Sequence, residues 1–166
     1  MESTPKIRHL IRQTVLQTLF QLEINPEMTE EEAVYFSSIG ESPDQEFSGD
    51  LAEAFKMGLA PAYQKPQIIK DSVEFLKQLI QGLKTNQEEI DQIIDDNMSG
   101  WNVSRIDRTN LLILRIATFE LLFTPEIDSS IIMNEAIELA KEFSDEKSSK
   151  FINGVLQGIQ NSEKEA

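Results

Sequence analysis

Apolar residues recur at intervals of three and four along most of this 166-residue chain, which is the spacing of amphipathic helices. The first such stripe covers residues 7–22 and predicts a helix with one apolar face. Its apolar positions are Ile7, Ile11, Val15, Leu19 and Leu22. Three basic residues fall off this stripe, and we expect them to face outward: Lys6, Arg8 and Arg12.

Further stripes lie in the middle of the chain. Residues 68–83 predict one helix, and Asn86 is a candidate N-cap for the next, because Glu89 follows three residues later as in a capping box. Residues 107–123 are apolar nearly all round, which predicts a central helix surrounded by others. The charged Arg115 within this helix therefore needs a partner if it is buried.

The segment over residues 24–49 is rich in Glu, Ser, Gly and Pro, which is typical of weakly ordered chain. It contains one short helix, predicted over residues 30–39 and preceded by Thr29. A second helix is predicted over residues 51–63, before Pro66.

Two more helices are predicted near the C-terminus. The first is capped by Asp128 or Ser129, and the last is capped by Ser144 or Asp145. No segment shows a convincing β alternation of apolar and polar residues. The fold class we expect is an all-α bundle of about seven helices.

The length is sufficient for one domain with its own core. We expect a single domain over residues 1–160, with an acidic, partly irregular segment at 24–70 and a polar tail at 161–166. Cysteine is absent, which excludes disulfides, a thiol nucleophile and cysteine metal sites. No apolar run approaches 18 residues and no signal-peptide pattern occurs, so we expect a cytoplasmic protein that does not enter a membrane.

The formal net charge is −14, which disfavours a protein that coats nucleic acid, because most of its surface would repel phosphates. The charge is distributed unevenly. Residues 1–22 carry three basic and one acidic side chain, whereas residues 23–98 carry 5 basic and 17 acidic ones. A positive N-terminus on an acidic body suits selective contact with an RNA strand better than broad duplex binding, although a short basic face is more often simply solvated.

The sequence shows no arrangement typical of an active site. None of the seven glycines belongs to a phosphate-binding loop, and the patterns GxSxG and HExxH are absent. With His9 as the only histidine, no histidine metal cluster can form. We therefore expect no enzymatic activity, no catalytic residue, no metal and no cofactor. Gly154 and Gly158 lie within an apolar-periodic helix, where we expect them to permit close helix packing.

The C-terminal half resembles the NusB family of bacterial transcription antitermination factors. The resemblance rests on Trp101, on Leu-Arg-Ile-Ala at 114–117, on Asn-Glu-Ala-Ile-Glu-Leu-Ala-Lys at 134–141 and on Lys-Phe-Ile-Asn-Gly-Val-Leu at 150–156, which occur in the order of the family. Upstream positions also match, so that the resemblance covers about two-thirds of the chain. They include Arg12, Gln17, Leu19, Phe20, Phe75, Leu79, Gly82, Asn86 and Asp91.

This resemblance implies a helical fold in two subdomains that binds the single-stranded boxA element of ribosomal RNA leader transcripts. It also implies a protein partner, the small-subunit ribosomal protein NusE, and a place in an antitermination complex on RNA polymerase. RNA contacts are implied in the basic N-terminal helix and at the start of the last helix. In this sequence those positions are Lys6, Arg8, His9, Arg12, Lys147, Ser148, Lys150 and Phe151.

For the protein partner, the resemblance implies contacts at Phe20, Ser104, Asn110 and Arg115. Periodicity alone leaves other roles open for three of the named residues. Phe20 and Phe151 could equally belong to the core, and Arg115 could form a buried network with Glu120.

The chain departs from the family pattern in its N-terminal helix, which has fewer basic residues, and at Asn110-Leu111, where the family usually has Asp-Arg. We therefore expect weaker RNA affinity than a strongly basic member would show. Two alternative functions stay open. One is a helical protein-interaction adaptor or homodimer that does not bind RNA, and the other is a detached relative of the helical domain fused to ribosomal RNA cytosine methyltransferases.

Overall fold

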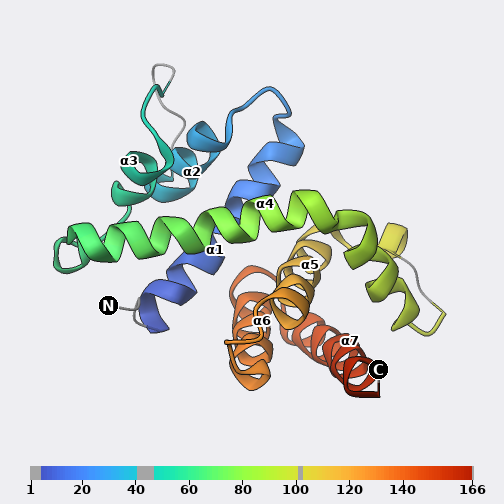
Figure 1. Cartoon of the computed structure of the whole chain (residues 1–166). Coiled ribbons are helices and arrows are strands. Elements are labelled where there is room, and N and C mark those ends of the chain that lie inside the picture. The colour runs from blue at the N-terminus through green and yellow to red at the C-terminus, as the bar shows by residue number, and fades with distance from the viewer. Residues whose placement is uncertain (1–4, 41–46, 101–102, 166) are drawn as a thin grey trace. The chain divides into compact units, whose positions relative to one another are not determined.

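The structure is a computed structural model that describes residues 5–40, 47–100 and 103–165. Over these residues the chain forms seven α-helices, two short 3-10 helices and no strand, which confirms the predicted fold class (Figure 1). The chain divides into two compact units, Met1–Ile80 and Gln81–Ala166. None of the helices in the described ranges is long and apolar enough to span a bilayer. Trp101, which contributes to the family resemblance, lies outside the described residues.

The first unit is built on α1 (Pro5–Ile24), whose predicted apolar stripe is buried at Ile7, Ile11 and Val15. Its neighbour α2 (Glu30–Ile39) begins where the sequence predicts, because Thr29 and Glu32 form a capping box. The backbone N–H of Glu32 donates to the hydroxyl of Thr29 at 3.1 Å, and the backbone N–H of Thr29 donates to the Glu32 carboxylate at 3.3 Å.

The acidic segment contributes to the core of the first unit. α2 packs against α1, and α3 (Leu51–Lys56) packs against α2, with Ala33, Val34 and Phe55 almost completely buried. The helix predicted over 51–63 ends at Lys56 and is followed by the 3-10 helix η1 (Pro61–Tyr63). Gly58 lies between the two, where a Cβ atom would lie only 2.9 Å from the carbonyl oxygen of Ser38, so this close approach requires glycine.

A single helix, α4 (Pro66–Asp96), replaces the two helices predicted between residues 68 and 96. The prediction that Asn86 is an N-cap is wrong. Its side-chain amide instead donates to the carbonyl oxygen of Gly82, one turn earlier in the same helix, at 2.8 Å. The helix continues because Leu83, Ile90 and Ile94 prolong one buried apolar stripe without an intervening glycine or proline.

The second unit contains the C-terminal half of α4, the 3-10 helix η2 (Val103–Arg105) and the last three α-helices. These are α5 (Arg108–Phe123), α6 (Ser129–Phe143) and α7 (Glu146–Glu165). α5 packs against both α6 and α7 and is buried at every position from Asn110 to Glu120, as expected for a central helix. The predicted polar tail is helical as far as residue 165, since α7 continues through it with exposed side chains at 161–164.

Gly82 and Gly154 illustrate two environments for a helical glycine in the second unit. A Cβ atom on Gly82 would overlap the ring of Phe119, which is buried on α5, so glycine is required where these helices cross. Gly154 is exposed with nothing within 4 Å of its Cβ position, and the prediction that it permits close packing is wrong. The same prediction is confirmed for Gly158, whose Cβ would lie 2.9 Å from Oδ1 of Asn97.

We predict that Gly82→Val lowers the free energy of unfolding by about 1–3 kcal/mol, which is the usual cost of overpacking a core. Gly154→Val is the matched control, because glycine and valine differ by only a few tenths of a kcal/mol in helix propensity. Urea denaturation of both variants measures the difference. Equal stability of the two variants would show that α4 and α5 do not approach as closely as the structure indicates.

Candidate functional site

The basic face of α1 is organised by one aromatic ring. The guanidinium carbon of Arg8 lies 3.8 Å from the ring centroid of Phe75 on α4, and that of Arg12 lies 5.4 Å from it. Both distances are within the range of cation–π interactions. Arg12 is only 2% exposed, so the expectation that it faces outward is wrong, because its charged group packs beside the buried Phe75.

The other predicted residues of α1 differ in exposure. Lys6 is exposed, whereas Arg8 and His9 are half-buried. Phe20 is also half-buried, which is compatible with either of the roles that its periodicity left open. Among the predicted residues of α1, the accessible surface therefore comes from Lys6 and from parts of Arg8, His9 and Phe20.

The start of α7 presents two exposed lysines, Lys147 and Lys150, beside the half-buried ring of Phe151. Asp145 caps this helix, as predicted, since its carboxylate accepts the backbone N–H of Ser148 at 2.7 Å. Hydrogen bonds from the backbone N–H and hydroxyl of Ser148 lower the pKa of Asp145 below its ordinary value. The charged cap therefore stabilises α7 above the ordinary carboxyl pKa, and this contribution is lost as the pH falls through the lowered folded-state pKa.

A hydrogen-bond network connects the start of α7 to the start of α5. The side-chain amide of Asn110 donates to the hydroxyl of Ser148 at 2.9 Å and to Oδ2 of Asp107 at 2.6 Å. Ser144 donates its own hydroxyl to that of Ser148 at 2.9 Å. The sequence placed Asn110 with the protein partner and Ser148 with the RNA, and the structure brings the two side chains into direct contact.

This network borders a pocket of about 300 Å³, which we call the α7 pocket. Its lining residues come from η2 and the starts of α5 and α7: Arg105, Ile106, Asp107, Asn110, Asp145, Lys147, Ser148 and Phe151. Two basic and two acidic side chains are present, so the formal charge of the lining is balanced. The α7 pocket therefore suits a neutral, polar ligand better than an isolated phosphate.

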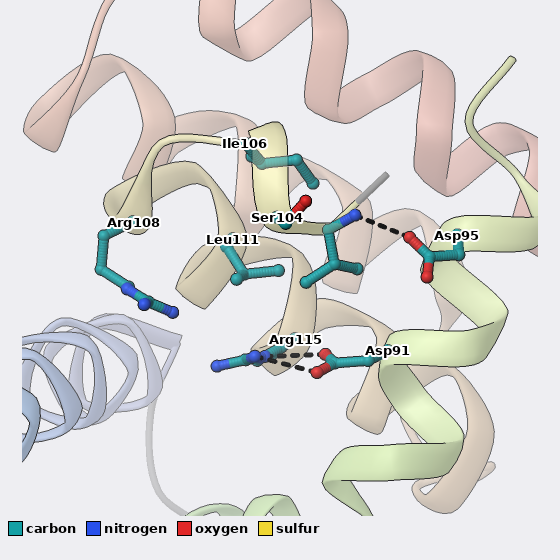
Figure 2. Close-up of a pocket in the computed structure, with 8 residues that line it drawn as sticks. Asp91, Asp95, Ser104, Ile106, Arg108, Leu111 and Arg115 are labelled. Atoms are coloured by element: carbon teal, nitrogen blue, oxygen red, sulfur yellow. Dashed lines mark hydrogen bonds and ion pairs between the residues drawn. The ribbon is translucent and has the colours of Figure 1, made fainter. Parts of the chain in front are cut away.

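A second pocket lies between the C-terminal half of α4 and α5, and we call it the Asp91 pocket (Figure 2). Its lining residues are Asp91, Asp95, Val103, Ser104, Ile106, Arg108, Leu111 and Arg115. Two of the residues predicted to contact the protein partner, Ser104 and Arg115, therefore lie in one place. Ile106 lines both pockets, which makes them neighbours within the second unit.

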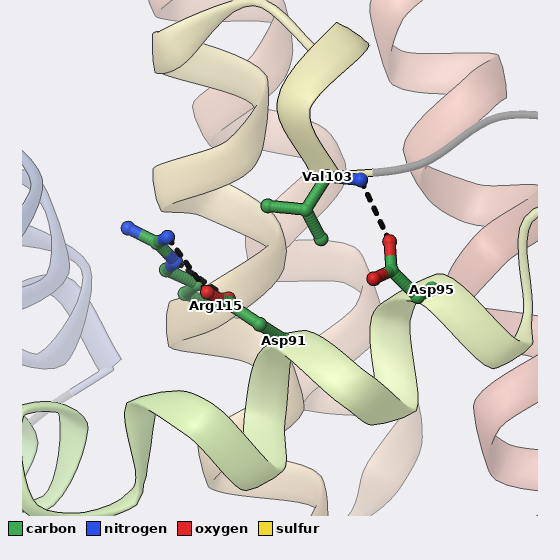
Figure 3. A network of polar contacts seen from close by, with 4 residues as sticks. All are labelled: Asp91, Asp95, Val103 and Arg115. Atoms are coloured by element: carbon green, nitrogen blue, oxygen red, sulfur yellow. Dashed lines mark hydrogen bonds and ion pairs between the residues drawn. The ribbon is translucent and has the colours of Figure 1, made fainter.

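The charge of Arg115 is satisfied by a residue that sequence reasoning did not pair with it. Its Nε and Nη2 atoms donate to the two carboxylate oxygens of Asp91 at 2.8 and 2.9 Å (Figure 3). The side chains of Arg115 and Asp91 are 10% and 24% exposed. One turn further along α4, Asp95 accepts the backbone N–H of Val103 at 2.7 Å, which fixes η2 against α4.

Comparison with known proteins gives consistent results. The sequence model of the NusB family matches residues 9–161. The transcription antitermination protein NusB of Clostridium botulinum (strain Loch Maree / Type A3) is 36% identical over 149 residues, which cover 90% of this chain and 96% of the relative. The protein of the same name from Listeria innocua is 33% identical, with coverage of 92% and 94%.

Solved structures agree with the sequence comparison. NusB of T. maritima has a TM-score of 0.65 at 27% identity and covers 97% of this chain and 93% of its own. A crystal structure of the antitermination factors NusB and NusE in complex with double-stranded RNA has a TM-score of 0.65 at 25% identity, with coverage of 95% and 98%.

Proposed function

The chain belongs to the NusB family, and from this membership we propose that it acts as a transcription antitermination factor. In this proposal it binds the boxA element of ribosomal RNA leader transcripts together with a NusE-family protein and joins an antitermination complex on RNA polymerase. Two findings support the proposal: the names of its relatives and the similarity to a structure that contains NusB, NusE and RNA.

The observation that carries the RNA-binding part of the proposal is the side-chain arrangement at the start of α7. Lys147 and Lys150 are exposed and lie one turn apart, and the half-buried Phe151 directly follows Lys150 in the sequence. Proteins that bind single-stranded RNA combine positive charge along the backbone with aromatic rings on which bases stack. The ring of Phe75 on α4 holds the Arg8 side chain of α1 in place, which reduces the entropy that Arg8 would lose on contacting a phosphate.

We assign the protein partner to the Asp91 pocket, because Ser104 and Arg115 both line it. Asn110 belongs instead with the RNA-binding residues, since it donates to Ser148 and lines the α7 pocket. Phe20 remains a proposed partner contact on α1. The acidic character of the chain, with a net charge of −14, predicts weak RNA binding by the protein alone and a strong dependence on the partner.

The test is a titration of labelled boxA RNA with this protein, alone and with a NusE-family protein, at several salt concentrations. We expect binding that strengthens at least tenfold when the partner is added. Lys150→Ala should weaken binding and should reduce the slope of log K against log salt concentration by about 1, the value of one phosphate contact. Lys164→Ala should change neither quantity, because Lys164 is an exposed lysine at the other end of α7. Absence of binding in both conditions would refute the proposal and favour the protein-only adaptor.

A further inference from the structure

Asn110 contains a buried acceptor that the described residues leave unused. Its side chain is 6% exposed, and its Oδ1 atom makes no hydrogen bond within the part of the chain that the structure describes. Both amide hydrogens are engaged, one by Asp107 and the other by Ser148. If the oxygen and nitrogen of this amide were exchanged, Oδ1 would face the Asp107 carboxylate, and two acceptors would repel each other. The hydrogen-bond network therefore fixes the orientation of the Asn110 amide.

A buried acceptor without a hydrogen-bond partner destabilises the fold, because it has lost its hydrogen bonds to water and has formed none within the protein. Asn110 lines the α7 pocket, so a ligand bound in that pocket is one source of a donor for Oδ1. The pocket also offers the ring of Phe151, against which a planar ligand can stack. The carboxylates of Asp107 and Asp145 also line the pocket. They favour a ligand whose edge carries hydrogen-bond donors, and they disfavour a phosphate.

We propose that the α7 pocket binds one RNA base that carries an exocyclic amino group, and that this amino group donates to Oδ1 of Asn110. The proposal rests on the RNA-binding function proposed above and adds a base preference to it. Adenine, cytosine and guanine have such a group. Uracil has only a ring N–H flanked by two carbonyl oxygens, which the carboxylates of Asp107 and Asp145 would repel.

Binding requires side chains at the pocket to shift, because Oδ1 is buried in the structure. Arg105 and Lys147 both line the pocket and are exposed, so their long side chains can move at low cost. The same two cations can then contact the phosphates on either side of the bound base. Phosphate contacts of this kind set the register, and the Asn110 contact supplies the base preference.

The experiment uses the protein together with a NusE-family partner and a set of boxA RNAs. In each RNA one amino-bearing base is replaced by an analogue without the amino group: purine for adenine, hypoxanthine for guanine, or pyrimidin-2-one for cytosine. We expect one position at which the replacement weakens binding by about three- to tenfold, the value of a single hydrogen bond. Asn110→Ala should weaken binding of the parent RNA by a similar factor and should be insensitive to the analogue at that position.

Asn161→Ala is the matched control, because Asn161 is exposed on α7 and lines neither the α7 pocket nor the Asp91 pocket; it should keep the full sensitivity to the analogue. The analogue series on the unaltered protein does not depend on whether Asn110→Ala folds. If every analogue binds as tightly as the parent RNA, or if Asn110→Ala keeps the sensitivity, this inference is wrong while the RNA-binding function stands. If the parent RNA does not bind with or without the partner, both the function and the inference are wrong.

Discussion

Phe151→Ala should weaken binding of boxA RNA by about five- to 150-fold, because stacking of a base on an aromatic ring contributes about 1–3 kcal/mol. The ring is half-buried and lines the α7 pocket, so part of its surface is available to a base. Its removal should lower the free energy of unfolding by less than the 3–5 kcal/mol typical of a fully buried phenylalanine. Fluorescence anisotropy with labelled RNA measures the first quantity, and urea denaturation measures the second.

Two further variants separate stacking from packing at this position. Phe151→Leu keeps most of the apolar volume and removes the aromatic face, so it should bind RNA about as weakly as Phe151→Ala while retaining more stability. Phe143→Ala is the matched control, since Phe143 is exposed on α6 and does not line the α7 pocket. A large loss of stability in Phe151→Ala with unchanged RNA binding by Phe151→Leu would assign Phe151 to the core.

Local signals in the sequence were sufficient for most helices. Thr29, a residue type that commonly caps helices, gave the start of α2, and the nearly continuous apolar run gave α5 as a buried central helix. The same type of signal failed at Asn86, because a capping pattern inside an unbroken apolar stripe is also compatible with a continuous helix. Periodicity shows which side chains share a face, and it does not show whether a helix ends.

The contacts that build the two pockets could not be predicted from spacing. Asn110 and Ser148 are 38 residues apart, and Arg115 and Asp91 are 24 residues apart, so each pair depends on how helices pack. Family resemblance supplied candidate residues without their contacts, so it gave no indication that Asn110 and Ser148 are hydrogen-bonded to each other. Arg12 is a related case, because its position off the apolar stripe gave no indication of the Phe75 ring beside it.

The acidic segment shows why composition is a weak guide to order. Residues 24–49 have the polar, glycine- and proline-containing composition of weakly ordered chain, yet α2 and the following α3 bury Ala33, Val34 and Phe55. A few well-placed apolar residues are sufficient to dock α2 onto α1 and α3 onto α2, since full burial of a Val or Phe side chain contributes about 1.5–3 kcal/mol. The helices α2 and α3 thus contribute to the core of the first unit.

Asp91→Ala should lower the free energy of unfolding by about 2–4 kcal/mol. Loss of one member of a buried ion pair typically costs 3–5 kcal/mol because the other charge remains buried, and the 24% exposure of Asp91 reduces that cost here. Asp95→Ala is the control within the same pocket, because it removes a single hydrogen bond to the backbone of Val103 and should cost about 1 kcal/mol. Thermal and urea denaturation give both values.

The double variant Asp91→Leu/Arg115→Met distinguishes the structural role of the pair from its proposed role in partner binding. Replacing both charges with apolar side chains of similar size should restore most of the stability lost in Asp91→Ala, because neither charge is then left buried alone. If the Asp91 pocket is the partner surface, the same double variant should still bind a NusE-family protein at least tenfold more weakly than the unaltered chain does. Restored stability with unchanged partner binding would restrict Asp91 and Arg115 to holding α4 against α5 and would move the partner surface elsewhere.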